Sequence, residues 1–232
     1  MARARQIVLA AAILASVIIT IGSLTEGELF GWARAPLLMP IVVVFTLLSR
    51  PLPGARVLVP LLAAQVFSWF GDIALASEGD YFVLGVAMFL LAQVSYIVTF
   101  LGIKGQHLLR LRPVVIVPYL VYYVGILALV LPKAGELALP LVVYGTTLTA
   151  MAVFAMDAWP RVPPSAARML LIGSILFVTS DSLIALTKFD IVPDNGFVSA
   201  ILIGTYCVAQ ILLAMGVLGA VRSVAAASSP TN

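Results

Sequence analysis

The chain has 232 residues, of which 62% are hydrophobic and 10% charged, with a formal net charge of +3 and a mean hydropathy of +1.16. Soluble domains carry about 25% charged residues, so this composition excludes a soluble globular protein. Cys207 is the single cysteine and His107 the single histidine, which excludes an internal disulfide and argues against a metal site built from cysteine or histidine. The basic residues lie between apolar runs, where they set membrane orientation, so we expect no nucleic acid partner.

Apolar runs long enough to cross a hydrocarbon layer of ~30 Å recur along the whole chain. They predict an all-α, polytopic membrane bundle of eight helices at about 7–24, 36–49, 57–77, 82–103, 113–132, 137–157, 168–187 and 197–221. The first run follows two arginines, as in a signal peptide, but it is too long and has no small-residue cleavage site, so we expect a retained helix. The predicted organisation is one transmembrane domain over 1–222 and a short disordered cytoplasmic tail over 223–232.

The distribution of charge predicts the orientation of the bundle. With the N-terminus inside, ten of the thirteen Lys and Arg residues fall in inner segments, whereas seven of the ten acidic residues fall in outer segments. The excess of basic residues inside is the determining signal. It predicts an integral protein of the plasma (inner) membrane with both termini in the cytoplasm.

Two aspartates belong to neither side of the membrane. Asp72 stands in SWFGDIALA (68–76) and Asp181 in TSDSLIALT (179–187). At a rise of 1.5 Å per residue both lie roughly 20 Å from the inner boundary. Because an aspartate in a transmembrane helix costs about 2.5–3.5 kcal/mol, two at matching depth favour a functional site. The alternative is that each aspartate bonds to a neighbouring helix and only fixes packing.

Polar side chains on several predicted helices could surround these aspartates. Gln65 and Ser68 share a helix face with Asp72, and Ser174 shares one with Asp181. Other helices contribute Gln93, Tyr96, Tyr144, Tyr206 and Gln210. Each can serve merely to hold helices together, but together they predict one polar pocket that opens toward the outer leaflet. An Ala-Gln pair follows each aspartate in the next helix, at 92–93 and 209–210, which suggests a four-plus-four internal repeat.

Four segments carry a resemblance to a known family: FSWFGDIAL (67–75), FLLAQVSY (89–96), LFVTSDSLIAL (176–186) and TYCVAQILLAMG (205–216). In these segments, and in its eight predicted spans, the chain resembles the YhhN-like lysoplasmalogenase family. The resemblance implies cleavage of the vinyl ether bond of lysoplasmalogens, to a fatty aldehyde and a glycerophospho head group, with Asp72 and Asp181 as catalytic residues. The family often has histidine where this chain has Gln93, and Lys-Pro where this chain reads Arg34-Ala35-Pro36.

The chemistry of vinyl ethers fits a pair of carboxyl groups. These bonds are cleaved after protonation of the β-carbon, and burial together with a second carboxylate favours a carboxyl group that stays protonated near neutral pH. We expect Asp72 and Asp181 to be the acid and base, in an unassigned order, with no metal or cofactor. Gln65, Gln93, Tyr96, Tyr206 and Gln210 would orient water and the glycerol backbone, and Arg34 and Lys188 would contact the phosphate of a lysophospholipid.

Two other functions remain open from the sequence. A proton-coupled or lipid transporter also places polar residues near the membrane midplane, although the chain lacks paired helices interrupted by Gly or Pro at mid-span. A catalytically silent, lipid-binding member of the family is the other alternative. Release of aldehyde from an alkenyl lysolipid separates the hydrolase from both. Beyond such a lipid, membrane lipids are the only partners that the sequence predicts.

Overall fold

The structure, a computed structural model, describes residues 2–24, 34–77 and 81–227. This part of the chain is helical and contains no strand. Its α-helices are α1 (Ala2–Leu24), α3 (Arg34–Leu48), α4 (Ala55–Ala76), α5 (Phe82–Leu101), α6 (Leu108–Leu111), α7 (Val117–Ala134), α8 (Ala138–Asp157), α9 (Pro164–Lys188) and α10 (Gly196–Ala227). Short 3-10 helices, η1 (Pro113–Ile116), η2 (Gly135–Leu137) and η3 (Trp159–Arg161), connect some of them.

The helix lengths and hydropathy confirm an integral membrane protein. Six apolar runs in the described residues are long enough to cross a membrane, and a shorter apolar helix covers Leu37–Leu48. One of the six runs, Pro113–Arg161, contains both α7 and α8. The count of eight crossings and the internal repeat stay predictions.

Several helix ends differ from the predicted ranges. α1 begins at Ala2 and α9 at Pro164, earlier than expected, because a helix can continue outside the hydrocarbon layer and proline suits its first turn. α10 continues to Ala227, past the predicted domain end at 222. The rest of the predicted tail, 228–232, lies outside the described residues.

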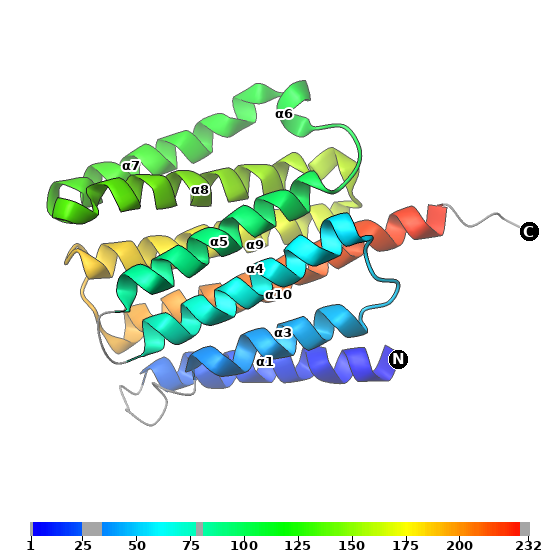
Figure 1. The fold of residues 1–232 in the computed structure, drawn as a ribbon, viewed down its shortest axis with the longest axis horizontal. Helices are drawn as coiled ribbons and strands as arrows, with labels where there is room; N and C mark the ends of the chain where they lie inside the picture. Colours follow the sequence, from blue (N-terminus) through cyan, green and yellow to red (C-terminus); the bar gives the residue numbers. More distant parts are fainter. Residues whose placement is uncertain (1, 25–33, 78–80, 228–232) are drawn as a thin grey trace, which may run out of the picture.

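Seven of the long helices form a closed ring. α1, α3, α4, α5, α8, α9 and α10 pack in this order, and α10 packs against α1. α7 lies outside the ring against α8, with fewer contacts to α9. Figure 1 shows α1 and α3 along one edge of the bundle and α7 and α8 along the opposite edge. Because α8 lies between α5 and α9, these two helices face each other across a gap that side chains fill.

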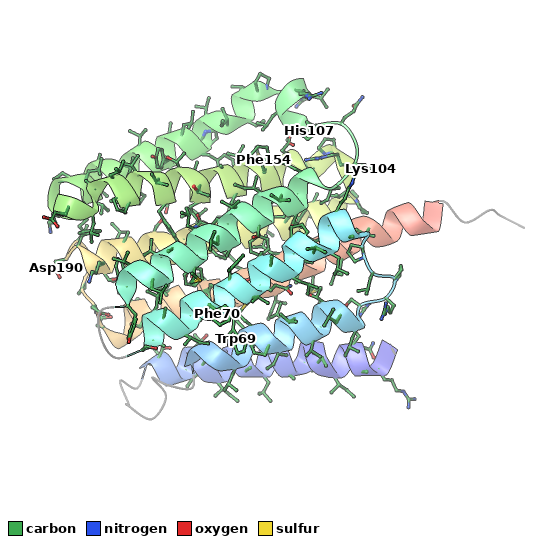
Figure 2. The ribbon with its side chains drawn as sticks, in the orientation of Figure 1. Trp69, Phe70, Lys104, His107, Phe154 and Asp190 are labelled. Carbon is green, nitrogen blue, oxygen red and sulfur yellow. The ribbon has the colours of Figure 1, made fainter. Side chains whose placement is uncertain are left out.

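The bundle has two distinct ends. The start of α1, the end of α10 and the short α6 lie at one, which we call the terminal end (Figure 1). The turn η2 and segment 189–195 lie at the other, which we call the cavity end. Figure 2 shows Lys104 and His107 at the terminal end and Asp190 at the cavity end.

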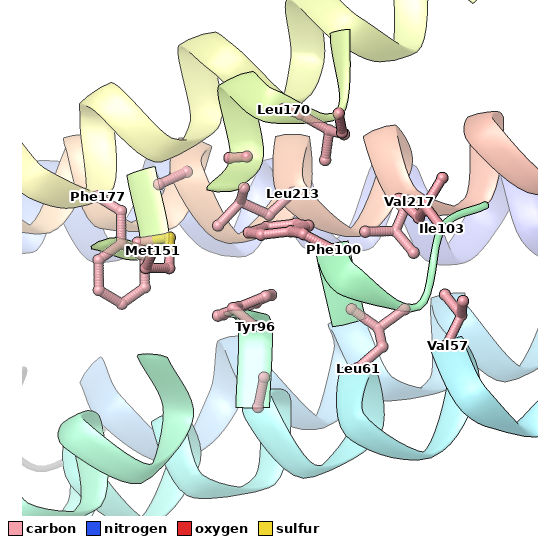
Figure 3. Packing of buried hydrophobic residues seen from close by; sticks show 14 of the residues in the cluster. Val57, Leu61, Tyr96, Phe100, Ile103, Met151, Leu170, Phe177, Leu213 and Val217 are labelled. Carbon is pink, nitrogen blue, oxygen red and sulfur yellow. The ribbon is translucent and has the colours of Figure 1, made fainter. Parts of the chain in front are cut away.

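Large side chains fill the interior of the ring toward the terminal end. Tyr96, Phe100, Phe177 and Leu213 are fully buried there, and the Tyr96 and Phe100 rings stack with centroids 6.0 Å apart. Figure 3 shows these side chains meeting between the helices. They make this half of the bundle a solid core.

A buried ion pair fastens the terminal end. The Asp157 carboxylate accepts hydrogen bonds from Arg161 Nη2 at 2.7 Å and from the Leu109 backbone N–H at 2.8 Å, and it contacts His107 Nδ1. Arg161 Nη1 donates to the carbonyl oxygen of Ile103 at 2.9 Å, just beyond the end of α5. The side chains of Asp157 and Arg161 are both fully buried. This cluster therefore joins α5, α6 and α8, a role that the sequence did not reveal.

We predict that Asp157→Ala destabilises the fold, because it leaves the buried Arg161 charge without its carboxylate. Removing one partner of a buried pair costs about 3–5 kcal/mol, which at 2–4 °C per kcal/mol lowers Tm by roughly 6–20 °C. Intrinsic fluorescence of the purified protein during heating measures this. The exposed Glu136 supplies the control, since Glu136→Ala removes an acid that has no ion-pair partner among the described residues. Equal melting of the two variants would show that the pair contributes nothing.

Close packing of α4 on α5 depends on Gly71. A Cβ at this position would lie 2.7 Å from Phe89 Cδ2 and 2.7 Å from Cε2. The Phe89 ring is 3% exposed, with Phe177 and Tyr206 edge-on to it at centroid distances of 6.4 and 5.9 Å. The ring therefore has little room to move away.

We predict that Gly71→Ala lowers stability by about 1–3 kcal/mol, the usual cost of overpacking a core. Gly125→Ala is the matched control, because a Cβ at Gly125 would meet nothing within 4 Å. Adding Phe89→Leu to Gly71→Ala shortens the clashing side chain, so it will recover part of the loss in a double-mutant cycle. Additive losses would mean that the two positions do not oppose each other.

Candidate functional site

Asp72 lies in the last turns of α4 and faces α10. Its Oδ2 accepts a hydrogen bond of 2.8 Å from the hydroxyl group of Tyr206. The side chain is only partly buried, because it lines a cavity at the cavity end of the bundle. A carboxylate from one side of the ring is thus held by a tyrosine from the other.

Asp181 lies on α9 and is 4% exposed. Its Oδ2 accepts hydrogen bonds from the Tyr144 hydroxyl at 2.6 Å and from Gln93 Nε2 at 3.2 Å. Its Oδ1 is buried and has no hydrogen-bond partner within the described part of the chain. One oxygen is therefore fixed by two donors, and the other is left for water or a ligand.

The two carboxylates line the same cavity, which has a volume of about 500 Å³. The remaining lining comes from six helices and the segment before α10: Ile19, Leu38, Leu75, Ala76, Phe82, Phe89, Ser180, Ile184, Thr187, Lys188, Asp194, Ser199, Leu202, Ile203, Tyr206 and Cys207. We call this space the polar chamber, since it contains both acids.

A chain of buried hydrogen bonds lies beside the polar chamber. The Tyr96 hydroxyl donates to Gln210 Oε1 at 2.6 Å, and Gln210 Nε2 donates to the Ser68 hydroxyl at 3.0 Å. All three residues have no exposed surface, and none lines the polar chamber. Their hydrogen bonds to one another connect α5, α10 and α4.

Two predicted site residues have partners elsewhere. Gln65 Nε2 donates to Thr46 Oγ1 at 2.9 Å on the neighbouring α3. The Ser174 hydroxyl donates to the Leu171 carbonyl oxygen of its own helix at 2.9 Å. Neither lines the polar chamber. Gln65 and Ser174 each share a helix face with an aspartate, but neither side chain contacts that aspartate. Residues two turns apart on an α-helix can face different neighbouring helices.

Charged groups stand at the exposed end of the polar chamber. Lys188 and Asp194 both line it and are exposed. The Lys188 ammonium lies 4.6 Å from the centre of the Phe82 ring, within the distance of a cation–π interaction. The side chain of Arg34, the other predicted phosphate contact, lies outside the described residues.

The residues directly before the aspartates, Gly71 and Ser180, shape the site. Gly71 leaves room for Phe89. The Ser180 hydroxyl donates to the Leu202 carbonyl oxygen of α10 at 2.9 Å and lines the polar chamber. Cys207 also lines it. No sequence pattern pointed to Ser180 or Cys207, because their contacts are with distant helices.

A second, apolar cavity of about 100 Å³ adjoins Asp181 between α5, α7, α8 and α9. Tyr144 lines it, with its hydroxyl on Asp181. Apart from this tyrosine, Asp181, Tyr123 and Ser182, its lining consists of hydrocarbon side chains and one glycine. We call it the apolar chamber. Gln93 lines neither chamber and reaches the site only through its bond to Asp181.

Three comparisons with known proteins bear on the identity of the chain. The search of curated proteins gave no match. The search of solved structures gave none either. The sequence model described as the YhhN family matches residues 30–217, which include α4, α5 and α9 and both aspartates. With most of its length matched, the chain belongs to the YhhN family.

Proposed function

We propose that this protein is a membrane-embedded hydrolase that cleaves the vinyl ether bond of lysoplasmalogen-type lysophospholipids. The observation that carries the proposal is that Asp72 and Asp181, from opposite sides of the ring, line one chamber. Family membership supports it, since the YhhN-like resemblance implies this reaction. A packing role alone would not require both acids to border the same open space.

The reaction needs one proton donor and one proton acceptor. A carboxylic acid transfers its proton to the β-carbon, and the electrons of the double bond form the new C–H bond, which leaves an oxocarbenium ion. Water adds to the α-carbon and gives a proton to the second carboxylate. That proton then passes to the glycerol oxygen as the hemiacetal C–O bond breaks, and the hemiacetal hydroxyl returns a proton to the first carboxylate. Paired carboxyl groups perform comparable chemistry in glycosidases.

The hydrogen bonds around the acids suit this chemistry. Tyr206 and Tyr144 each hold one carboxylate at Oδ2, which fixes the direction of its remaining oxygen. In Asp181 that oxygen, Oδ1, has no partner among the described residues. In this proposal the tyrosines and Gln93 are positioning residues, and the two aspartates touch the reacting atoms.

The exposed end of the polar chamber suits a phosphate-bearing head group. Among the described residues that line it, Lys188 carries a positive charge. Its ammonium group can pair with a phosphate there. The tail of the lipid would then lie on the far side of Asp181 from its head group. Tyr96, Gln210, Ser68, Gln65 and Ser174 stabilise the surrounding helices in this arrangement.

We predict that Asp72→Asn and Asp181→Asn each reduce turnover of a vinyl-ether lysolipid by at least 10²-fold, the typical contribution of a proton-transfer group. Release of aldehyde by the purified protein measures this. Asp190→Asn is the matched control, because Asp190 lies outside both chambers and asparagine tolerates its φ of 52°. Near wild-type turnover in either test variant would remove that aspartate from the mechanism.

We predict a smaller loss for Tyr206→Phe and Tyr144→Phe, about 10- to 100-fold in turnover, because each removes one hydrogen bond to a carboxylate but leaves the carboxylate in place. Tyr119→Phe serves as the control, since Tyr119 lies on α7 and lines neither chamber. Unchanged turnover in both test variants would contradict a positioning role for the tyrosines.

A further inference from the structure

The apolar chamber contains features that the proposed reaction does not yet use. It lies between four helices and is lined mainly by hydrocarbon groups such as Val86, Leu127, Leu141 and Ala185. A polar ligand would lose its hydration there without gaining hydrogen bonds. The chamber therefore suits a hydrocarbon group.

The two chambers adjoin each other at Asp181. Both are lined by Leu75, Phe82, Phe89, Asp181 and Ile184. These residues come from α4, α5 and α9, and α5 faces α9 across the gap that α8 spans. These shared side chains form the wall between the chambers, so a ligand that occupied both would have to pass between α5 and α9 beside Asp181.

We propose that the apolar chamber binds the hydrocarbon chain of a single-chain lipid, while its glycerol and head group occupy the polar chamber. This inference rests on the proposed function and deepens it. An ether lipid is polar on one side of its ether oxygen and apolar on the other. The lining likewise changes at Asp181, from the charged and hydroxyl groups of the polar chamber to the hydrocarbon groups of the apolar chamber.

The volume of the apolar chamber limits what it can hold. A cavity needs roughly 10–15 Å³ of such volume to hold one water-sized group, so about 100 Å³ accommodates several methylene groups. This is enough for the first part of one chain but not for two. The chamber accordingly favours a lysolipid over a diacyl lipid, and the rest of a long chain extends toward the surrounding bilayer.

The same placement assigns the acid and the base. Along an alkenyl lysolipid the β-carbon is nearer the chain, and the α-carbon is bonded to the ether oxygen. The β-carbon therefore lies on the side of the apolar chamber, which Asp181 lines and Asp72 does not. Asp181 is the proton donor to that carbon, and Asp72, in the larger polar chamber, lies beside the incoming water.

A photocrosslinking experiment tests the chain site without depending on turnover. The probe is a saturated 1-O-alkyl lysophosphoethanolamine with a diazirine at the sixth chain carbon, added to the full-length protein in phosphatidylcholine vesicles. We expect labels on Tyr123, Leu127 or Leu141, which line the apolar chamber. Excess unlabelled alkyl lysolipid will suppress this labelling at least fivefold, and the diacyl lipid of the vesicles will not.

Filling the chamber should displace the probe. Ala185→Trp places an indole where the chain would lie, so we expect labelling of the chamber to fall at least fivefold. Ala87→Trp is the matched control, because Ala87 is exposed on α5 and lines neither chamber. Leu141→Trp provides a second filling variant, and only variants that keep a wild-type Tm are compared.

Each outcome bears on one proposal. Labels confined to α1, α3 or lipid-facing positions, no labelling at all, or unchanged labelling in both filling variants would overturn the chain site. Aldehyde release from the alkenyl lysolipid is measured in parallel. Labelling of the chamber without aldehyde release leaves the lipid site standing and refutes the hydrolase, and aldehyde release without chamber labelling does the reverse.

Discussion

The need to satisfy two carboxyl groups inside an apolar bundle determines how its central helices pair. A buried polar group without a partner costs several kcal/mol in a medium that has no water. Each carboxyl group has one partner from across the ring: Tyr206 of α10 bonds Asp72 of α4, and Gln93 of α5 bonds Asp181 of α9. Asp181 has a second partner in Tyr144 of the neighbouring α8. Tyr96 of α5 and Gln210 of α10 then bond each other. These contacts tie the α4–α5 pair to the α9–α10 pair.

The same crosswise pairing leaves space at one end of the bundle. α4 packs extensively on α5, and α9 on α10, so the two pairs approach each other mainly through long side chains. Phe89 lies at the centre of this zone, edge-on to Phe177 and Tyr206, and it lines both chambers. Gly71 lets the ring approach α4. Small residues beside the acids thus allow close helix packing next to an open site. Gly71 leaves room for Phe89, and Ser180 bonds the Leu202 carbonyl oxygen of α10.

The sequence predicted the long helices and the position of an aspartate within two of them, because a long apolar run and an aspartate within it are local signals. It did not predict the partners. Gln93 and Asp181 are 88 residues apart, and no spacing rule connects them. Ser174 and Gln65 were assigned to the pocket by helix face, yet both bond elsewhere, because a face is shared by more than one neighbouring helix. No local pattern marks Asp157, and only the folded chain brings it to His107 and Arg161.

The solid core toward the terminal end bears on the choice between a hydrolase and a transporter. A transporter must open its site alternately to both sides of the membrane. Here the polar chamber reaches exposed residues such as Lys188 and Asp194 at the cavity end. On the other side of the acids, Tyr96, Phe100 and Leu213 have no exposed surface, and the buried Asp157–Arg161 pair fastens the ends of α5 and α8. Opening a path there would require repacking this core and separating a buried ion pair, whereas hydrolysis requires access from one side only. This packing supports the proposal of a hydrolase with access from one side, and it makes passage through the bundle the more costly alternative.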